Sequence, residues 1–224
     1  MQTGTAEFLE SFTSARYRFF ESRTHAGVIK KLLLALGMAL LTGLSAQIRI
    51  PLPWSPVPIT GQTFAAILSG VLLGRWWGGA SMIVYLALGL AGVPWFNGFS
   101  GGMGHLVGPT GGYLIGFVVA SLFIGDMTDR YVRARSFTAM LVLMLIANFL
   151  IIHVLGLVQL GLWLNLVKGS PVSLGELLWL GTIPFIPGDV TKTVLAALIA
   201  RGITPKEAYN GEADAAKWHS WRLP

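Results

Sequence analysis

The sequence predicts an all-α integral membrane protein, a bundle of six transmembrane helices. Hydrophobic residues make up 54% of its 224 residues and charged residues 12%, against about 25% charged residues in soluble domains. The apolar runs are longer than a soluble core helix needs, and the mean hydropathy is +0.66. We expect a cytoplasmic N-terminal extension (1–28), a six-helix membrane domain (29–201) and a cytoplasmic C-terminal tail (202–224).

The N-terminal extension is polar, and the first apolar run begins only near Ile29, after several acidic residues. A secretory signal has a different order, in which an apolar core directly follows a short basic region. We therefore predict a short cytoplasmic helix over residues 8–24, of the kind that lies at a membrane interface.

Six apolar runs follow, separated by polar, glycine-rich or proline-rich segments. The predicted spans are Val28–Ile48, Thr63–Leu73, Gly78–Leu90, Tyr113–Gly125, Phe137–Leu160 and Leu177–Ile199. The second and third are short for a spanning helix, unless they are tilted or extend into their flanks. Prolines predict a rigid, extended loop over 49–62 and a break near Pro184 in the last span. The glycines of 92–112 oppose a regular helix and favour a loop that folds over a ligand.

Lysine and arginine residues gather on one side of this arrangement. That side carries Arg16, Arg18, Arg23, Lys30, Lys31, Arg75, Arg130, Arg133, Arg135, Arg201, Lys206, Lys217 and Arg222. The other side has only Arg49 and Lys168, and Lys192 belongs to a span or its mouth. Because short cytoplasmic loops carry an excess of Lys and Arg, both termini are predicted to be cytoplasmic. The proline-rich and glycine-rich loops are then external.

Two opposite charges, Asp189 and Lys192, adjoin the last apolar run. Their spacing places them on one face of a helix, and Pro187 suits its first turn. One interpretation is an intrahelical ion pair that caps a helix at the membrane surface. The other is a ligand site in the outer half of the bundle, since ionisable residues inside membranes usually line a pathway or pocket. Polar residues on the same side add weight to the ligand site: Arg49, Gln62, Asn97 and His105.

Several other kinds of site lack the residues that they need. The four histidines are scattered without metal-ligand spacing, and His153, in the middle of a span, is interpreted as a packed or hydrogen-bonded side chain rather than a proton relay. The glycine-rich loop lacks the GK[ST] ending of a phosphate-binding loop. No second carboxylate joins Asp189 within a span, which argues against an enzyme. We expect no cofactor, no metal and no nucleic-acid partner.

Small residues recur at every fourth position in the first span, at Ala35, Ala39 and Gly43. This spacing allows two helices to approach closely in lipid. The residues alone favour packing inside the bundle, and docking onto another membrane subunit is the alternative.

Three motifs, in the order expected for one known family, carry a resemblance over about residues 30–201: RIPLPWSPVPITGQTFA, WFNGFSGGMGHLVGPTGGYLIGF and PFIPGDVTKTVLAALIA. Together they resemble the BioY family, the biotin-binding S components of energy-coupling factor (ECF) transporters. The resemblance implies a six-helix membrane fold and high-affinity capture of biotin from outside. It also implies a membrane coupling subunit and two ATPase subunits as partners, which hydrolyse the ATP. In S-component families an AxxxA motif on the first helix meets the coupling subunit, and Ala35 and Ala39 fit this motif.

The resemblance also implies roles for the pocket residues. Asp189 is expected to accept an N–H of the ureido ring of biotin, and Lys192 to donate to its carbonyl. Asn97 can serve the same ring. The carboxylate tail needs a cation, for which we prefer Arg49, with Lys192 as the alternative. Residues expected to pack against the bicycle or to add hydrogen bonds are Trp95, Phe96, Phe99, Tyr85, Gln62 and Tyr113.

A second function remains open at this stage, an autonomous transporter of biotin or a similar vitamin driven by protons or sodium. It needs an ion pathway through the bundle, and only His153 and Asp189 are titratable near one. The substrate itself is implied by the resemblance alone, because the same polar groups would serve another ureido or amide vitamin.

Overall fold

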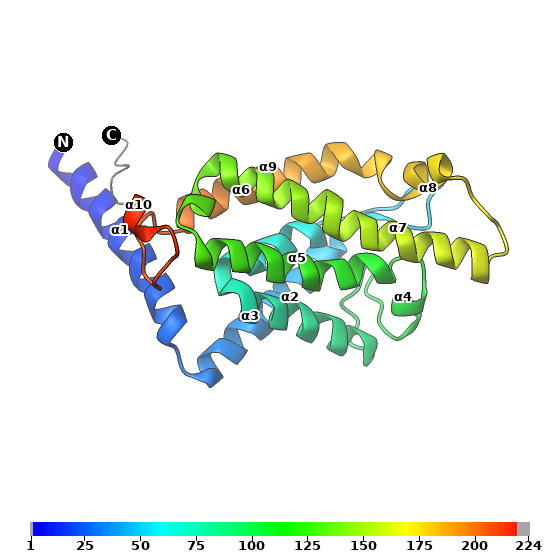
Figure 1. The fold of residues 1–224 in the computed structure, drawn as a ribbon. Coiled ribbons are helices and arrows are strands. Elements are labelled where there is room, and N and C mark those ends of the chain that lie inside the picture. Colours follow the sequence, from blue (N-terminus) through cyan, green and yellow to red (C-terminus); the bar gives the residue numbers. More distant parts are fainter. Residues whose placement is uncertain (1, 219–224) are drawn as a thin grey trace.

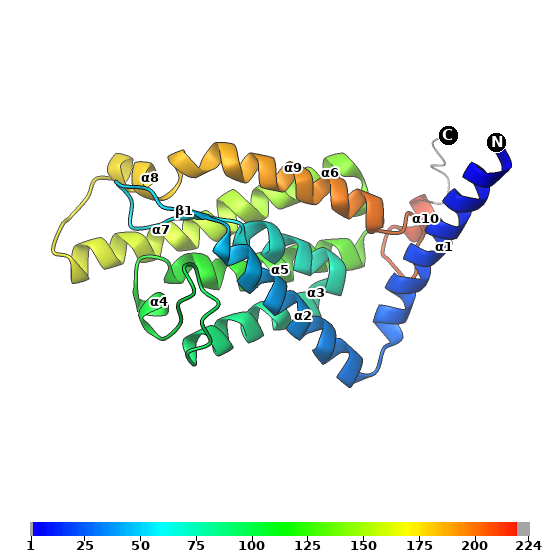
Figure 2. The same cartoon turned by 180° about the vertical axis from the view of Figure 1, so that it is seen from behind.

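A computed structural model describes the backbone of residues 2–218 and the side chains of residues 11–216. The chain forms a helical bundle whose long helices run side by side, with both ends of the chain at the same end of the bundle (Figures 1 and 2). The helices are α1 (Gln2–His25), α2 (Val28–Gln47), α3 (Gln62–Leu90), α4 (Gly104–Val107), α5 (Gly111–Arg130), α6 (Phe137–Ile146), α7 (His153–Leu162), α8 (Leu174–Gly181), α9 (Ile186–Ile203) and α10 (Ala215–Trp218).

Short elements connect or interrupt these helices. Two-residue strands β1 (Arg49–Ile50) and β2 (Ile59–Thr60) pair in antiparallel register within the proline-rich loop. The remaining turns are η1 (Arg133–Arg135), η2 (Ala147–Ile152), η3 (Trp163–Val167) and η4 (Ile183–Phe185). The η2 and η3 turns are π-helical, so α6, η2, α7 and η3 form one continuous helical rod. The predicted break in the last span is confirmed, since α8 and α9 are separate helices joined by η4.

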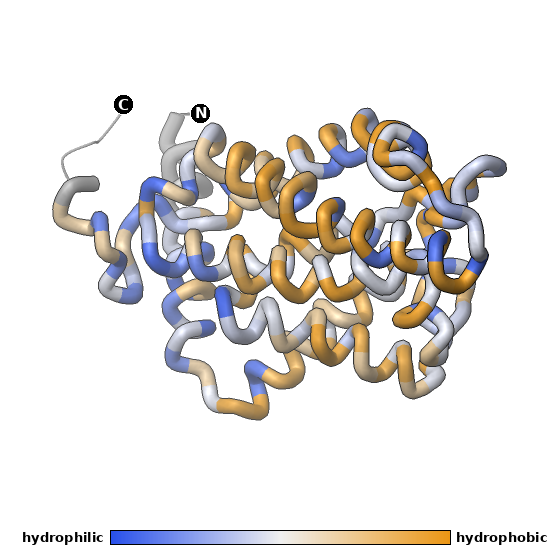
Figure 3. Tube along the Cα trace, turned by 45° about the vertical axis from the view of Figure 1, so that its right-hand side comes forward, coloured by the Kyte–Doolittle hydropathy of each residue, from blue (hydrophilic) through white to orange (hydrophobic). Residues whose placement is uncertain are grey.

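Within the described residues, five helical segments have the length and apolar character of a membrane span. The predicted count of six spans is therefore not confirmed. The difference lies in α3, which covers both short predicted spans and contains non-helical backbone at Gly74. Figure 3 shows apolar residues along the length of the bundle and a polar concentration near the chain termini.

Gly74 divides α3 into two arms that fold back on each other. Its φ of 78° lies in the left-handed region that favours glycine. The arms touch through Gly70 and Gly78, since a Cβ on Gly78 would lie 2.8 Å from the Cα of Gly70. Both glycines also face α5, where the hydroxyls of Ser69 and Ser121 are 2.8 Å apart. Small residues thus let three helical segments pack backbone against backbone.

An ion pair from two other helices caps the turn at Gly74. The Arg23 guanidinium of α1 donates to the carbonyls of Val71 (3.1 Å) and Leu72 (3.0 Å), at the end of the first arm. Arg23 also pairs with Asp129 of α5 at 2.6 Å, and Asp129 accepts the backbone N–H of Arg75 (2.9 Å) that begins the second arm. Carbonyls and N–H groups that a helix end leaves without partners are thereby satisfied.

The segment after α9 packs onto the same end of the bundle. The guanidinium of Arg135 pairs with the carboxylate of Glu212, both buried, and lies over the ring of Tyr209, 4.5 Å from its centroid. The Tyr209 hydroxyl accepts from Arg23 at 2.9 Å. Asp214 caps η1 through the backbone N–H groups of Val132 and Arg133 (2.7 and 3.0 Å). We call this region, where α1, the Gly74 turn and residues 204–216 meet, the basic end.

Ala35 and Ala39 lie inside the bundle, with exposures of 1% and 0%. Ala35 belongs to a buried cluster with Met38 and Leu73, which joins α2 to α3. The structure thus places both alanines where the internal-packing interpretation expects them and not on the surface that a partner could reach. Docking onto another subunit through these two side chains remains a prediction, and it would require that they become uncovered.

We expect Arg23→Ala to destabilise the fold, because it leaves the Asp129 carboxylate and two carbonyls without their donor. The free energy of unfolding in detergent micelles should fall by about 3 kcal/mol. Arg18→Ala is a matched control, since exposed Arg18 donates, within the described part of the chain, only to the Ser14 carbonyl of its own helix, and it should change stability by less than about 0.5 kcal/mol. Equal losses in the two variants would contradict the capping role of Arg23.

Candidate ligand-binding site

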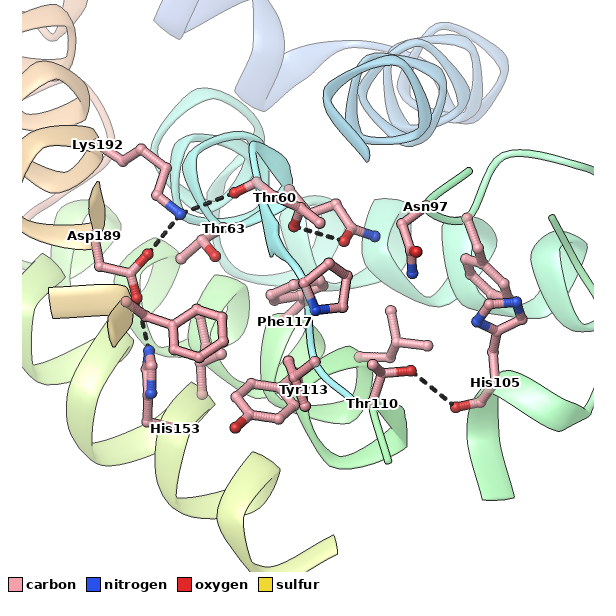
Figure 4. Close-up of a pocket in the computed structure, with 17 residues that line it drawn as sticks. Thr60, Thr63, Asn97, His105, Thr110, Tyr113, Phe117, His153, Asp189 and Lys192 are labelled. Carbon is pink, nitrogen blue, oxygen red and sulfur yellow. Dashed lines mark hydrogen bonds and ion pairs between the residues drawn. The ribbon is translucent and has the colours of Figure 1, made fainter. Parts of the chain in front are cut away.

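A cavity lies between β2, α3, α5, α7, α9 and the glycine-rich loop, and side chains from these elements line it (Figure 4). His105 of α4 is part of its wall, and α4 lies at the opposite end of the bundle from α1 (Figure 1). Polar side chains gather at two places in the cavity wall, around Asp189 and around Asn97, and apolar side chains such as Phe117 lie between them (Figure 4).

Asp189 is buried, with 2% of its surface exposed, and lies in the first turn of α9. One of its carboxylate oxygens pairs with Lys192 Nζ at 2.5 Å, one turn further along the helix. Pro187 begins this helix without losing a hydrogen bond, because the first N–H groups of a helix have no partner within it. The partly positive N-terminus favours a carboxylate in the first turn.

The second oxygen of Asp189 accepts from two side chains on another helix. His153 Nε2 lies 2.7 Å from Oδ2, and Asn148 Nδ2 lies 3.2 Å from the same atom. His153 and Asn148 are also buried, with exposures of 3% and 0%. The carboxylate is therefore held at both oxygens by groups from α9, η2 and α7.

Lys192 joins this cluster to the proline-rich loop. Its ammonium group donates to the backbone carbonyl of Thr60, in β2, at 2.8 Å. Asp189 and Lys192 both line the cavity. The ion pair thus does more than cap a helix, because it also fixes the position of the proline-rich loop against α9.

Among the side chains that the structure describes, each member of the pair lacks a partner for one hydrogen-bonding position. A carboxylate has about four lone-pair sites, and Asp189 accepts from Lys192, His153 and Asn148. An ammonium group has three donors, and Lys192 uses two of them, on Asp189 and on the Thr60 carbonyl. The cavity wall therefore offers one acceptor beside one donor, which complements a ligand with adjacent N–H and C=O groups.

A second hydrogen-bond chain supports the wall formed by α3. Gln62 Nε2 donates to the hydroxyl of Tyr85 at 2.6 Å, and Gln62 Oε1 accepts from Thr60 at 2.8 Å. Trp95 packs against Tyr85, with ring centroids 5.3 Å apart, and donates its Nε1–H to the Tyr85 carbonyl at 2.9 Å. Tyr85 and Trp95 lie behind the cavity wall, where they hold Gln62 and the glycine-rich loop in place.

His105 holds the loop that carries Asn97. The Ser100 hydroxyl donates to the Asn97 carbonyl at 2.8 Å, so its oxygen accepts from His105 Nε2 at 2.9 Å. Burial lowers the pKa of His105, which favours the neutral ring, and in this arrangement its hydrogen lies on Nε2. Within the described residues the Asn97 side-chain amide makes no hydrogen bond, and it faces the cavity (Figure 4).

Six of the predicted ligand residues line the cavity: Asp189, Lys192, Asn97, Gln62, Phe96 and Tyr113. Tyr85 and Trp95 lie one layer further out. Phe99 is 74% exposed and donates its backbone N–H to the Gln47 side chain. Arg49 is exposed and lies against Gly98, where a Cβ would come within 2.6 Å of its guanidinium, but it is not part of the cavity wall.

Sequence reasoning did not assign several residues that the structure brings to this site. His153 is hydrogen-bonded, as predicted, but its partner is Asp189. Asn148 donates a further hydrogen bond to the Asp189 carboxylate, and Thr60 and Thr63 line the cavity beside Lys192. The available signal for His153 and Asn148 was their polarity within an apolar run, but no spacing rule connects them to a residue on α9. No group of three potential metal ligands occurs in the part of the chain that the structure describes.

Comparison with known proteins agrees with this architecture. A family model described as the BioY family matches residues 14–208, which begins within α1 and extends past α9. A crystal structure of the S-component for biotin from an ECF-type ABC transporter superposes with a TM-score of 0.68. It shares 28% sequence identity and covers 77% of this chain and 89% of that chain.

Curated relatives lead to the same family. A probable biotin transporter BioY from Methanothermobacter thermautotrophicus is 53% identical over 70% of this chain and all of its own length. The biotin transporter BioY of Rhodobacter capsulatus is 37% identical, over 76% of this chain and 90% of its own. With a matched family model over most of its length and relatives at this identity, the chain belongs to the BioY family, a family of multi-pass membrane transporters.

Proposed function

We propose that this protein captures biotin with high affinity and takes it up as the S component of an ECF-type ABC transporter. One observation carries the proposal: Asp189 and Lys192 line one cavity, and among the described residues each keeps one hydrogen-bonding position without a partner, an acceptor beside a donor. The ureido ring of biotin carries N–H and C=O groups side by side. A relative 53% identical to this chain is described as a probable biotin transporter, and the superposed crystal structure is that of a biotin S-component.

The rest of the cavity suits the remaining parts of biotin. Asn97 offers donors and an acceptor for the far side of the ureido ring, and Phe96, Phe117 and Phe185 provide apolar surface for the bicycle. A buried polar ligand atom that lost its partner would weaken binding by a few kcal/mol, so these groups also set specificity. For the carboxylate tail we keep Arg49 as the proposed cation, outside the cavity wall and near Asn97, with the free donor of Lys192 as the alternative.

We further propose that both termini are cytoplasmic and that the cavity opens to the outside of the cell membrane. The uneven distribution of Lys and Arg supports this orientation, because α1 and the turns with Arg75 and Arg135 lie together at the basic end (Figure 1). The protein itself is not proposed to be an enzyme and needs no cofactor. A membrane coupling subunit and two ATPase subunits would supply the energy for release of biotin to the cytoplasm.

Asp189→Asn and Lys192→Met are expected to weaken biotin binding by roughly 100-fold or more, because each removes a charged hydrogen-bonding partner from the ureido ring. The measurement is isothermal titration or radiolabelled biotin binding with the purified protein in detergent. Asp126→Asn is the matched control, since Asp126 pairs with Arg75 at the basic end (2.9 Å). Wild-type affinity in both site variants, with intact folding, would refute the assignment of the site.

Uptake should require the partner ATPases. We expect cells that produce this protein together with its coupling and ATPase subunits to accumulate biotin, and a catalytically inactive ATPase variant to abolish accumulation. A protonophore applied at constant ATP should leave the initial rate unchanged. If the protein alone, in vesicles, takes up biotin in response to a proton or sodium gradient, the protein is an autonomous secondary transporter instead.

A further inference from the structure

The π-helical turn η2 changes which side chains of the α6–α7 rod face Asp189. In a regular α-helix, residues five positions apart point about 140° away from each other. Here the backbone N–H of His153 donates to the Asn148 carbonyl, an i→i+5 bond that stacks the two residues. Both side chains therefore reach the same carboxylate oxygen, at 2.7 Å and 3.2 Å. Such π-turns are frequent at functional sites.

The partners of the His153 ring place a hydrogen on Nε2. Asp189 Oδ2 only accepts, so Nε2 carries a hydrogen. On the opposite side, Nδ1 lies 3.1 Å from the Gly181 carbonyl and 3.1 Å from the Thr182 hydroxyl. The neutral ring can accept from Thr182, and the charged ring can donate to Gly181. Either state keeps the bond to Asp189, so the ring orientation is fixed by the end of α8.

Aromatic rings hold His153 from its remaining sides. The ring centroids of Tyr113, Phe149 and Phe185 lie 5.8, 5.3 and 6.0 Å from that of His153. Tyr113 also donates to the Gly181 carbonyl at 2.7 Å. A buried imidazole in contact on all these sides has little freedom to turn. The position of the donor to Asp189 Oδ2 is therefore set by side chains of α5, η2 and η4.

We propose that His153, together with Asn148, is a positioning residue that keeps the Asp189–Lys192 pair monodentate. Without donors on Oδ2, the carboxylate could turn so that both oxygens contact the Lys192 ammonium one turn away. That contact would use the donor of Lys192 that is otherwise free and would turn the free lone pair of Asp189 away from the cavity. His153 and Asn148 thus preserve the acceptor and donor that face the ligand. The inference rests on the proposed function, since the ligand group concerned is the ureido ring.

Two substitutions separate the hydrogen bond from the packing of the ring. His153→Phe keeps an aromatic ring but removes the donor, and His153→Gln keeps an N–H donor at the end of a flexible side chain. We expect the dissociation constant for biotin to rise by about 10- to 100-fold in His153→Phe, the loss of one hydrogen bond to a charged group. His153→Gln should recover most of this loss. Asn148→Leu should shift the constant in the same direction by a smaller factor.

An infrared measurement without ligand tests the mechanism directly. The difference spectrum between each protein and its Asp189→Asn counterpart isolates the carboxylate stretch of Asp189. We expect the band to move in His153→Phe, as the carboxylate turns onto Lys192, and to stay near its wild-type position in His153→Gln. Asn165→Leu is the control for a polar residue on the same rod, because Asn165 donates only to the Gly161 carbonyl at an exposed site, and neither band nor affinity should change.

The outcomes are distinct. If wild-type protein binds biotin and His153→Phe binds equally well, or if His153→Gln loses as much affinity as His153→Phe, the positioning role is overturned and the proposed function stands. If the band moves as expected but the wild-type protein does not bind biotin, the proposed function fails and the positioning of Asp189 stands. Should His153→Phe not fold, Asn148→Leu decides the question through the same two measurements, and wild-type values for both would overturn the proposal.

Discussion

The buried charge of Asp189 is the constraint on which the functional half of this protein depends. A carboxylate enclosed in an apolar bundle is very unfavourable unless donors surround it. Here Lys192 comes from the same helix, His153 and Asn148 from the α6–α7 rod, and the backbone of β2 is joined through Lys192. These partners fix the relative positions of α9, the rod and the proline-rich loop. The cavity wall is therefore a consequence of satisfying one charge, and Asp189, Lys192 and His153 all line the cavity.

At the opposite end of the bundle, buried charges are also paired, but their partners use them within the protein. At the basic end, Arg23 and Asp129 satisfy the helix ends at the Gly74 turn, and Arg135 pairs with Glu212. These charges are used within the protein, and the C-terminal segment covers them. One end of the molecule is thus closed by its own polar contacts, while the other holds polar groups with free capacity. This polarity agrees with a protein that receives a ligand at one face and is anchored at the other.

Glycine makes this compact arrangement possible in the membrane helices. Gly70, Gly78 and Gly125 allow the two arms of α3 and α5 to approach until backbone atoms touch, and buried serine hydroxyls bridge them. In lipid, such close packing and hydrogen bonding replace the hydrophobic effect as the force between helices.

The sequence by itself determined the membrane class, most helix positions, the grouping of basic residues and the shared helix face of Asp189 and Lys192, because hydropathy, charge and i, i+3 spacing are local properties. Only the tertiary structure decided which distant residues meet. His153 and Asn148 reach Asp189 because a π-turn rotates them, and no periodic pattern encodes that rotation. Tyr85 and Trp95 lie behind the cavity wall and Ala35 and Ala39 lie inside the bundle, because burial depends on which face of a helix its neighbours cover. That information belongs to the packing of all the helices together and not to any one segment.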